Sequence, residues 1–203
     1  MSLKNLIIAI VLGSALASGI FVASQWHRPP ELQTAFVIPE PQALPAFSLL
    51  DQHGQAVTAD VFRGQWDLVF FGFTHCPDIC PLTLQLLASV KKELQDAGMK
   101  TLPRIVLVSV DPERDTPDLM RQYVDYFGAG NLAITGDLDG IRALTAALGV
   151  YFAKAPTDDG NYSVDHSAAV LVVNPDAEFA ALFSAPHTVE NFVHDLPLLM
   201  SRQ

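Results

Sequence analysis

The sequence predicts an α/β domain behind an N-terminal transmembrane helix, and three observations support this fold class. An apolar run extends from Leu6 to about Ala23. Two continuous apolar segments, Leu68–Phe73 and Leu102–Val110, are rich in β-branched and aromatic residues, which is typical of strands buried on both faces of a parallel sheet. Segments with helical periodicity alternate with them. The length of 203 residues suits one domain with a sizeable core plus an appendage.

The first 28 residues are predicted to form a membrane anchor. The apolar run is close to the roughly 20 residues that a helix needs to span a bilayer. Ala15-Leu16-Ala17 resembles the cleavage site of an export signal, but the apolar run continues past it and Trp26 suits the membrane interface. We therefore favour a retained anchor over a cleaved signal. Because Lys4 lies on the short side, we expect the rest of the chain on the extracytoplasmic, periplasmic side.

Residues 29–45 contain five prolines. This composition predicts a stiff, extended spacer between the anchor and a domain formed by residues 46–203. The domain is expected to open with a hairpin made of Phe47–Leu50 and Ala56–Thr58, with His53 in the turn between them.

Strands and helices then alternate along the chain. Gly98 is expected to end the first helix, and Thr116 with Pro117 to begin the second. A polar loop, Pro156–Tyr162, precedes a final hairpin and helix, and this order predicts a thioredoxin-like fold. The elements expected after the first buried strand are helix 82–97, strand 102–110, helix 118–127, strand 132–135, helix 138–148, strands 168–173 and 178–183, and helix 189–200.

The acidic composition excludes some partners. The formal net charge is −10, so phosphate backbones and anionic membrane surfaces would repel the chain. We therefore expect no nucleic-acid partner.

The only two cysteines, Cys76 and Cys80, follow the first buried strand. Pro81 fits the first turn of a helix and disfavours helical geometry at the residue before it, so Cys76–Cys80 is predicted to be an irregular turn that caps the helix. Both sulfur atoms would then lie near a helix N-terminus, which favours thiolates. The pair can be a redox dithiol, a metal site or two buried small residues.

A metal ion held by two thiolates needs a further ligand. His166 lies in a polar loop that enters a strand, with Asp165 beside it to orient the ring, and it could face the cysteines across the end of the sheet. A lone histidine is more often structural. As a ligand set, Cys76, Cys80 and His166 would suit Cu(I), or Cu(II) with an added ligand, better than zinc, which prefers four ligands.

Other polar residues are weaker candidates. His75 adjoins Cys76, and adjacent residues rarely converge on one ion. His187 and His194 are expected on the surface. Asp111 stands at the carboxyl end of a strand, where open α/β sheets place their sites, but loop and capping carboxylates are common there.

Three motifs resemble the SCO/SenC family of membrane-anchored copper proteins: Phe73–Pro81, Ser109–Pro117 and Val164–Ser167. The resemblance extends from about Ala46 to the C-terminus. It implies that Cys76, Cys80 and His166 bind one copper ion. It also implies a role in assembling the dinuclear copper centre of cytochrome c oxidase, with the copper-site subunit of a respiratory oxidase as partner.

The predicted function is that of an extracytoplasmic copper chaperone. The alternative is a thiol–disulfide oxidoreductase that reduces the cysteines of the copper-site target, and a peroxiredoxin-like peroxidase is a weaker third class. Because an oxidised Cys76–Cys80 disulfide offers no thiolates, copper loading should depend on redox state.

Overall fold

The computed structural model describes residues 31–157 and 160–201, together with residues 4, 5, 7, 10, 12–16, 18 and 19. The chain divides into two compact units, Met1–Glu31 and Leu32–Gln203. The predicted anchor, residues 1–28, lies largely outside the described residues. Within the part that is described, no helix is both long enough and apolar enough to cross a membrane.

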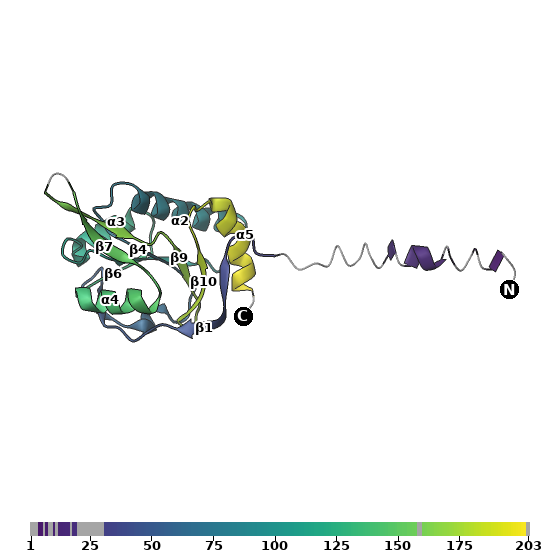
Figure 1. Ribbon diagram of the computed structural model, residues 1–203, viewed down its shortest axis with the longest axis horizontal. Helices are drawn as coiled ribbons and strands as arrows, with labels where there is room; N and C mark the ends of the chain where they lie inside the picture. The colour runs from purple at the N-terminus through teal and green to yellow at the C-terminus, as the bar shows by residue number, and fades with distance from the viewer. Residues whose placement is uncertain are drawn as a thin grey trace. The chain divides into compact units, whose positions relative to one another are not determined.

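In the second unit, the described strands form one large mixed sheet and a separate hairpin. Strands β4, β5 and β6 are parallel neighbours, whereas β9 runs antiparallel to β4 on its other side. The sheet order is β1-β10-β9-β4-β5-β6-β2-β3, and β7 pairs with β8 alone (Figure 1). The strands are β1 (Phe36–Ala43), β2 (Leu49–Asp51), β3 (Ala56–Val57), β4 (Asp67–Gly72), β5 (Arg104–Ser109), β6 (Leu132–Thr135), β7 (Phe152–Pro156), β8 (Tyr162–His166), β9 (Val170–Val173) and β10 (Glu178–Phe183).

Helices cover both faces of the large sheet. The crossovers from β4 to β5 and from β5 to β6 place α2 and α3 on one face, and α4 lies on the opposite face (Figure 1). Thr116 caps α3 by accepting a hydrogen bond from the amide of Leu119, as the sequence predicts. The helices are α2 (Ile79–Asp96), α3 (Pro117–Asp125), α4 (Leu138–Ala147) and α5 (Val189–Met200), with a 3-10 turn η1 (Ala59–Phe62).

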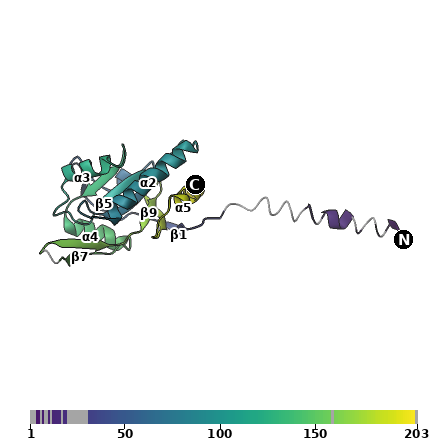
Figure 2. The same ribbon diagram turned by 90° about the horizontal axis from the view of Figure 1, so that it is seen from above.

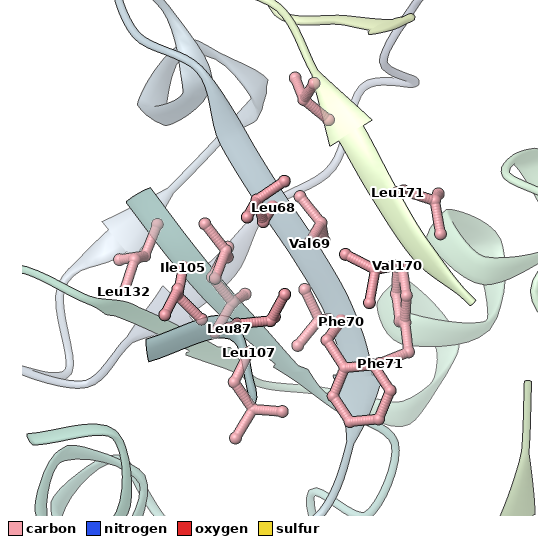
Figure 3. Close-up of a cluster of buried hydrophobic side chains, with 14 of the residues drawn as sticks. Leu68, Val69, Phe70, Phe71, Leu87, Ile105, Leu107, Leu132, Val170 and Leu171 are labelled. Atoms are coloured by element: carbon pink, nitrogen blue, oxygen red, sulfur yellow. The ribbon is translucent and has the colours of Figure 1, made fainter. Parts of the chain in front are cut away.

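Strand β4 forms the centre of the core and is buried along its whole length. Its side chains alternate between the two faces. Val69 and Phe71 face α4, since they line a narrow apolar void together with Leu144. Leu68 and Phe70 point to the other face, which α2 covers, and Figure 3 shows the cluster around them. A non-alternating apolar run therefore predicted a strand buried on both sides correctly.

The proline-rich segment is not a free spacer along its whole length. Residues Phe36–Ala43 form β1, which pairs with β10. Before this strand, the carboxylate of Asp195 on α5 accepts backbone hydrogen bonds from Gln33, Thr34 and Ala35. Prolines are tolerated because β1 is an edge strand whose pairing is irregular. The folded domain thus begins before residue 46, and the sequence pattern misplaced its start.

Candidate metal site

The sheet topology brings the cysteines and His166 to one edge. The chain leaves β4 after Gly72 and enters the segment Phe73–Asp78, called here the cysteine loop. Because β9 runs antiparallel to β4 and Val170 pairs with Phe70, the residues just before β9 arrive where the cysteine loop begins. His166 lies four residues before Val170. His166 is thereby brought close to the two cysteines, although it lies far from them in the sequence.

The helix begins earlier than the proline suggested. Helix α2 starts at Ile79, so Cys80 lies in its first turn. The predicted irregular turn, Cys76–Cys80, is present only as far as Asp78, and the prediction was wrong for its last two residues. The first amides of a helix have no intrahelical partner, and a proline in the first turn therefore removes no hydrogen bond. Asp78 is the N-cap residue, but its side chain makes no capping bond. Instead, the amide of Cys80 points at the sulfur of Cys76, 3.5 Å away.

The two cysteine residues differ in exposure. Cys76 is partly exposed, whereas Cys80 is buried against β4. A Cβ atom added at Gly72 would lie only 2.9 Å from the sulfur of Cys80, so a glycine is needed for this close approach. Burial raises the pKa of the Cys80 thiol, against the expectation that the helix N-terminus favours the thiolate there. A bound cation would supply the missing stabilisation, since a metal ion deprotonates a coordinating thiol.

His166 is the last residue of β8, and its ring is held in one orientation. Its Nε2 lies 3.4 Å from the sulfur of Cys80, and its Nδ1 lies 3.0 Å from the carbonyl oxygen of Ser167. A carbonyl only accepts, so Nδ1 carries the proton and Nε2 presents its lone pair to the sulfur. The rings of Phe70 and Phe73 pack against the imidazole, with their centroids 5.6 and 6.0 Å from its own. Burial lowers the pKa of His166, which favours the neutral ring.

The orienting partner differs from the predicted one. Asp165 is exposed, and the hydrogen bond to the ring comes from the neighbouring backbone of Ser167 instead. The segment around His166 is also not a loop, because residues 152–156 and 162–166 form the β7–β8 hairpin. Alternation of apolar and polar residues in Tyr162–His166 was a strand signal that the sequence reading missed.

The structure brings all three predicted ligands together. The two sulfur atoms and the imidazole nitrogen lie within 4.8 Å of one another. Three other histidines have different partners: His75 contacts the hydroxyl of Thr74, His187 the carbonyl of Ala168, and His194 the carboxylate of Asp195.

Asp111 belongs to a cluster that holds the hairpin in place. Its carboxylate accepts a hydrogen bond from the hydroxyl of Tyr162 at 2.8 Å and another from the Nε of Arg114. The Nη1 of Arg114 donates to the backbone oxygen of Tyr162, and its guanidinium lies 3.9 Å from the centre of the Tyr162 ring. These three residues are called the clamp below. Asp111 therefore links the loop after β5 to the hairpin, and sequence reasoning did not identify its partners.

Asp115 anchors the start of the cysteine loop by hydrogen bonds. It is buried, and it accepts hydrogen bonds from the amide and the hydroxyl of Thr74 and from the hydroxyl of Ser109. Burial raises its pKa. The motif Ser109–Pro117 therefore contacts both parts of the site: Asp115 bonds to the cysteine loop, and Asp111 and Arg114 bond to the hairpin that carries His166. Its proximity to the cysteines could have been predicted from β5 running parallel to β4, since their carboxyl ends meet.

The comparisons with known proteins agree with this geometry. The family model described as SCO1/SenC matches residues 38–201. The chain belongs to the SCO1/SenC family. The resemblance predicted from the three motifs is thereby confirmed, and so is the thioredoxin-type α/β fold of the domain.

Individual relatives cover most of the domain. The human mitochondrial protein SCO1 homolog is 34% identical over 186 residues, which are 90% of this chain and 61% of the relative. The mouse mitochondrial protein SCO2 homolog is 40% identical over 151 residues, 74% of this chain and 59% of the relative. This chain thus spans about three fifths of these two relatives. The crystal structure of Arabidopsis thaliana ScoI with copper bound is 31% identical and has a TM-score of 0.75, covering 78% of this chain and 98% of that one.

Proposed function

We propose that this SCO1/SenC protein is a copper chaperone that binds one copper ion through the sulfur atoms of Cys76 and Cys80 and the Nε2 of His166. The observation that carries the proposal is the convergence of these three atoms within 4.8 Å. Two thiolates and one imidazole form a soft ligand set with low coordination, which suits Cu(I). A structural zinc ion prefers four protein ligands, and the cluster found among the described residues has three.

The unequal exposure of the cysteines supports a transfer role. Because Cys76 is partly exposed and Cys80 is buried, a thiolate of a target protein can approach from the side of Cys76. The incoming thiolate would replace Cys76 first, and Cys80 and His166 would release the ion last. The dinuclear copper centre of cytochrome c oxidase, in the copper-site subunit, is the target that the family resemblance implies.

Location outside the cytoplasm is part of the same proposal. The apolar run from Leu6 to about Ala23, preceded by Lys4, supports a membrane anchor with the domain on the periplasmic side. Two cellular measurements test this. The full-length chain should sediment with membranes after an alkaline wash, and a C-terminal alkaline phosphatase fusion should be active. A soluble chain or an inactive fusion would contradict the proposed location.

A second function, thiol–disulfide exchange, is favoured by the same cysteine pair. A partly exposed thiol beside a buried one suits attack followed by resolution. The Cys76 thiolate would attack a target disulfide to form a mixed disulfide. Cys80 would then displace the second target thiolate. The target is thereby reduced by two electrons to a dithiol, and this chain is oxidised to a Cys76–Cys80 disulfide. An external dithiol would have to reduce that disulfide for another turnover.

Copper titration of the reduced full-length chain in detergent tests the proposed function. Cu(I) and Cu(II) are titrated separately against a competing chelator, with His166→Ala and Cys76→Ser as site variants and His53→Ala as a control in an exposed turn. We expect one-to-one binding that both site variants weaken, that the control leaves unchanged and that oxidation of the dithiol abolishes. Equal affinity of His166→Ala and the wild type would refute the ligand assignment. Rapid copper-free disulfide exchange by His166→Ala would favour the oxidoreductase.

A further inference from the structure

The first two turns of α2 expose apolar side chains beside the cysteine loop. Ile79 is 44% exposed and Leu82 is 61% exposed. Residues three apart lie on the same side of a helix, so these two side chains are neighbours. The inner side of the helix faces the core, where Cys80, Leu84 and Leu87 are buried. Leu82 therefore occupies a solvent-facing position at which an amphipathic helix normally carries a polar residue.

This apolar surface adjoins the exposed cysteine. Ile79 and Cys76 line one hollow of about 260 Å³, and His166 lines it from the hairpin. Cys76 is the partly exposed cysteine of the pair, so a protein that brings a sulfur atom to it through this hollow also covers Ile79. Single exposed apolar side chains are common on protein surfaces. Two neighbouring ones beside a reactive thiol are instead typical of a surface that a partner covers.

The charged residues that border this apolar surface are carboxylates. Asp78 is exposed and directly precedes Ile79, and its side chain makes no capping hydrogen bond. Asp165 is also exposed and lines the same hollow. Among the described residues, neither carboxylate forms an ion pair with a lysine or an arginine. The border of the apolar surface therefore carries negative charge that is free to attract a cation.

Two basic side chains on the hairpin side of the site are already paired. Arg114 of the clamp is paired with Asp111, and the ammonium group of Lys154 lies 2.6 Å from the carboxylate of Glu113. The whole chain is acidic as well, with a formal net charge of −10. A complementary partner therefore needs an apolar side chain for the start of α2 and a lysine or arginine for the carboxylates.

We propose that the exposed start of α2 and the two carboxylates beside it dock the target protein. The target presents an apolar side chain and a lysine or arginine next to the cysteine that reaches Cys76. The proposal rests on the proposed function, since the same encounter transfers copper or exchanges a disulfide. Apolar contact holds the target while sulfur ligands exchange, and charge attraction speeds the encounter. The four residues, called the docking surface, are Asp78, Ile79, Leu82 and Asp165.

Leu82→Gln tests the apolar part of the docking surface. Leu50→Gln is the control, because Leu50 is 36% exposed and lies in β2, on the far side of β4 from β9. The full-length variants in detergent are loaded with Cu(I), and transfer to the reduced soluble copper-site domain of a cytochrome c oxidase is timed. At equal copper affinity, Leu82→Gln should transfer about tenfold more slowly than the wild type and the control. Equal rates would overturn the proposal and leave copper binding intact.

The double variant Asp78→Asn, Asp165→Asn tests the charged part. Asparagine keeps the size of the side chain and suits the N-cap position as well as aspartate does, so the start of α2 should persist. Raising the ionic strength should slow transfer by the wild type, because salt screens the attraction. The double variant should be slower at low salt and should depend less on salt. A wild-type rate that is constant or rises with salt would overturn the proposal.

Formation of a mixed disulfide gives a readout without copper. In a Cys80→Ser chain, the Cys76 thiolate attacks a cysteine of the acceptor domain that carries thionitrobenzoate, so a new disulfide forms and thionitrobenzoate leaves. Leu82→Gln should slow this reaction about tenfold, but not the reaction with a small aromatic disulfide. Equal slowing of both reactions would assign the effect to the thiol and overturn the proposal. A wild-type chain that binds no copper but keeps the difference would refute the chaperone function alone.

A second copy of this chain is the competing occupant of the docking surface. Sedimentation of the full-length chain in detergent should give the same mass for the wild type and for Leu82→Gln at the concentrations of the transfer assay. Self-association that Leu82→Gln abolishes would assign the docking surface to a second copy and overturn the proposal.

Discussion

The cysteine loop is held by hydrogen bonds to a buried carboxylate, whereas the strand that carries His166 is held by hydrogen bonds to the partly buried clamp. Asp115, under the loop, is buried and bonded to Thr74 and Ser109. The β7–β8 hairpin instead forms a sheet of its own, and Tyr162 links it to Asp111. The thiols therefore lie on a loop of the large sheet, and the imidazole lies on a separate two-stranded sheet. Substitution of Asp115 should lower the stability of the domain, while substitution in the clamp should lower copper affinity and leave the domain folded.

The largest expected effect comes from Asp115→Ala. The substitution leaves the amide and hydroxyl of Thr74 and the hydroxyl of Ser109 without their acceptor in a buried place. We expect a loss of about 3 kcal/mol in the free energy of unfolding, measured by urea denaturation. Asp118→Ala, at an exposed position in the first turn of α3, is the control and should cost less than about 1 kcal/mol. Equal losses in the two variants would show that the buried hydrogen bonds of Asp115 do not stabilise the domain.

Gly72→Ala probes the packing of the Cys80 sulfur against β4. The new methyl group would lie 2.9 Å from the sulfur of Cys80 and 3.0 Å from the ring of Phe70, and neither neighbour is exposed. We expect a loss of about 2 kcal/mol in stability and weaker copper binding because the sulfur must move. In a Cys80→Ala background the same substitution should cost less, since one of the two contacts is gone. An equal loss of stability in both backgrounds would show that the glycine is not needed to make room for the sulfur of Cys80.

Tyr162→Phe tests the clamp with almost no change in shape. The substitution removes the hydroxyl that donates to Asp111 and keeps the ring beneath Arg114. A loss of about 1 kcal/mol in stability is expected, together with a several-fold loss of copper affinity through His166. Tyr151→Phe, at an exposed residue just before β7, serves as the control. A clamp variant with wild-type copper affinity would mean that the hairpin holds His166 without it.

The smallest effect on the site is expected from Asp195, which lies on α5, while β7 lies at the other end of the domain (Figures 1 and 2). Burial raises the pKa of this carboxyl, but hydrogen bonds from Gln33, His194, Ala35 and Thr34 outweigh burial and lower the pKa from 3.8 to about 2. The folded state therefore prefers the ionised form more than the unfolded chain does. The stabilisation is complete above pH 3.8 and is lost as the pH falls toward about 2.

Urea denaturation across this pH interval measures the effect. Asp195→Asn should flatten the pH dependence of stability without changing copper affinity at neutral pH. A steep dependence that persists in the variant would assign the acid sensitivity to other carboxylates. A change in copper affinity would show that the start of the folded domain is coupled to the site.

The hydrophobic pattern alone located the buried strands β4 and β5 and most helices, because alternation and apolar runs are local signals. Capping chemistry placed the start of α3 at Pro117, since Thr116 and Pro117 act on the nearest turn. Pro81 led to a predicted helix start that was too late, because a proline in the first helical turn removes no hydrogen bond and need not mark the helix boundary. The spacer prediction failed from about residue 33 onward, because pairing with β10 and the hydrogen bonds to Asp195 involve partners far along the chain.

The sequence by itself determined the candidate ligand residues, the thioredoxin-like order of elements and the family, because these depend on residue identity and on short spacings. Only the tertiary structure decided how His166 reaches the thiols and which nitrogen it presents. The antiparallel pairing of β9 with β4 brings residues about ninety positions apart to one edge. The backbone of Ser167 then fixes the ring. Such contacts arise from packing between distant segments, and no local pattern in the sequence encodes them.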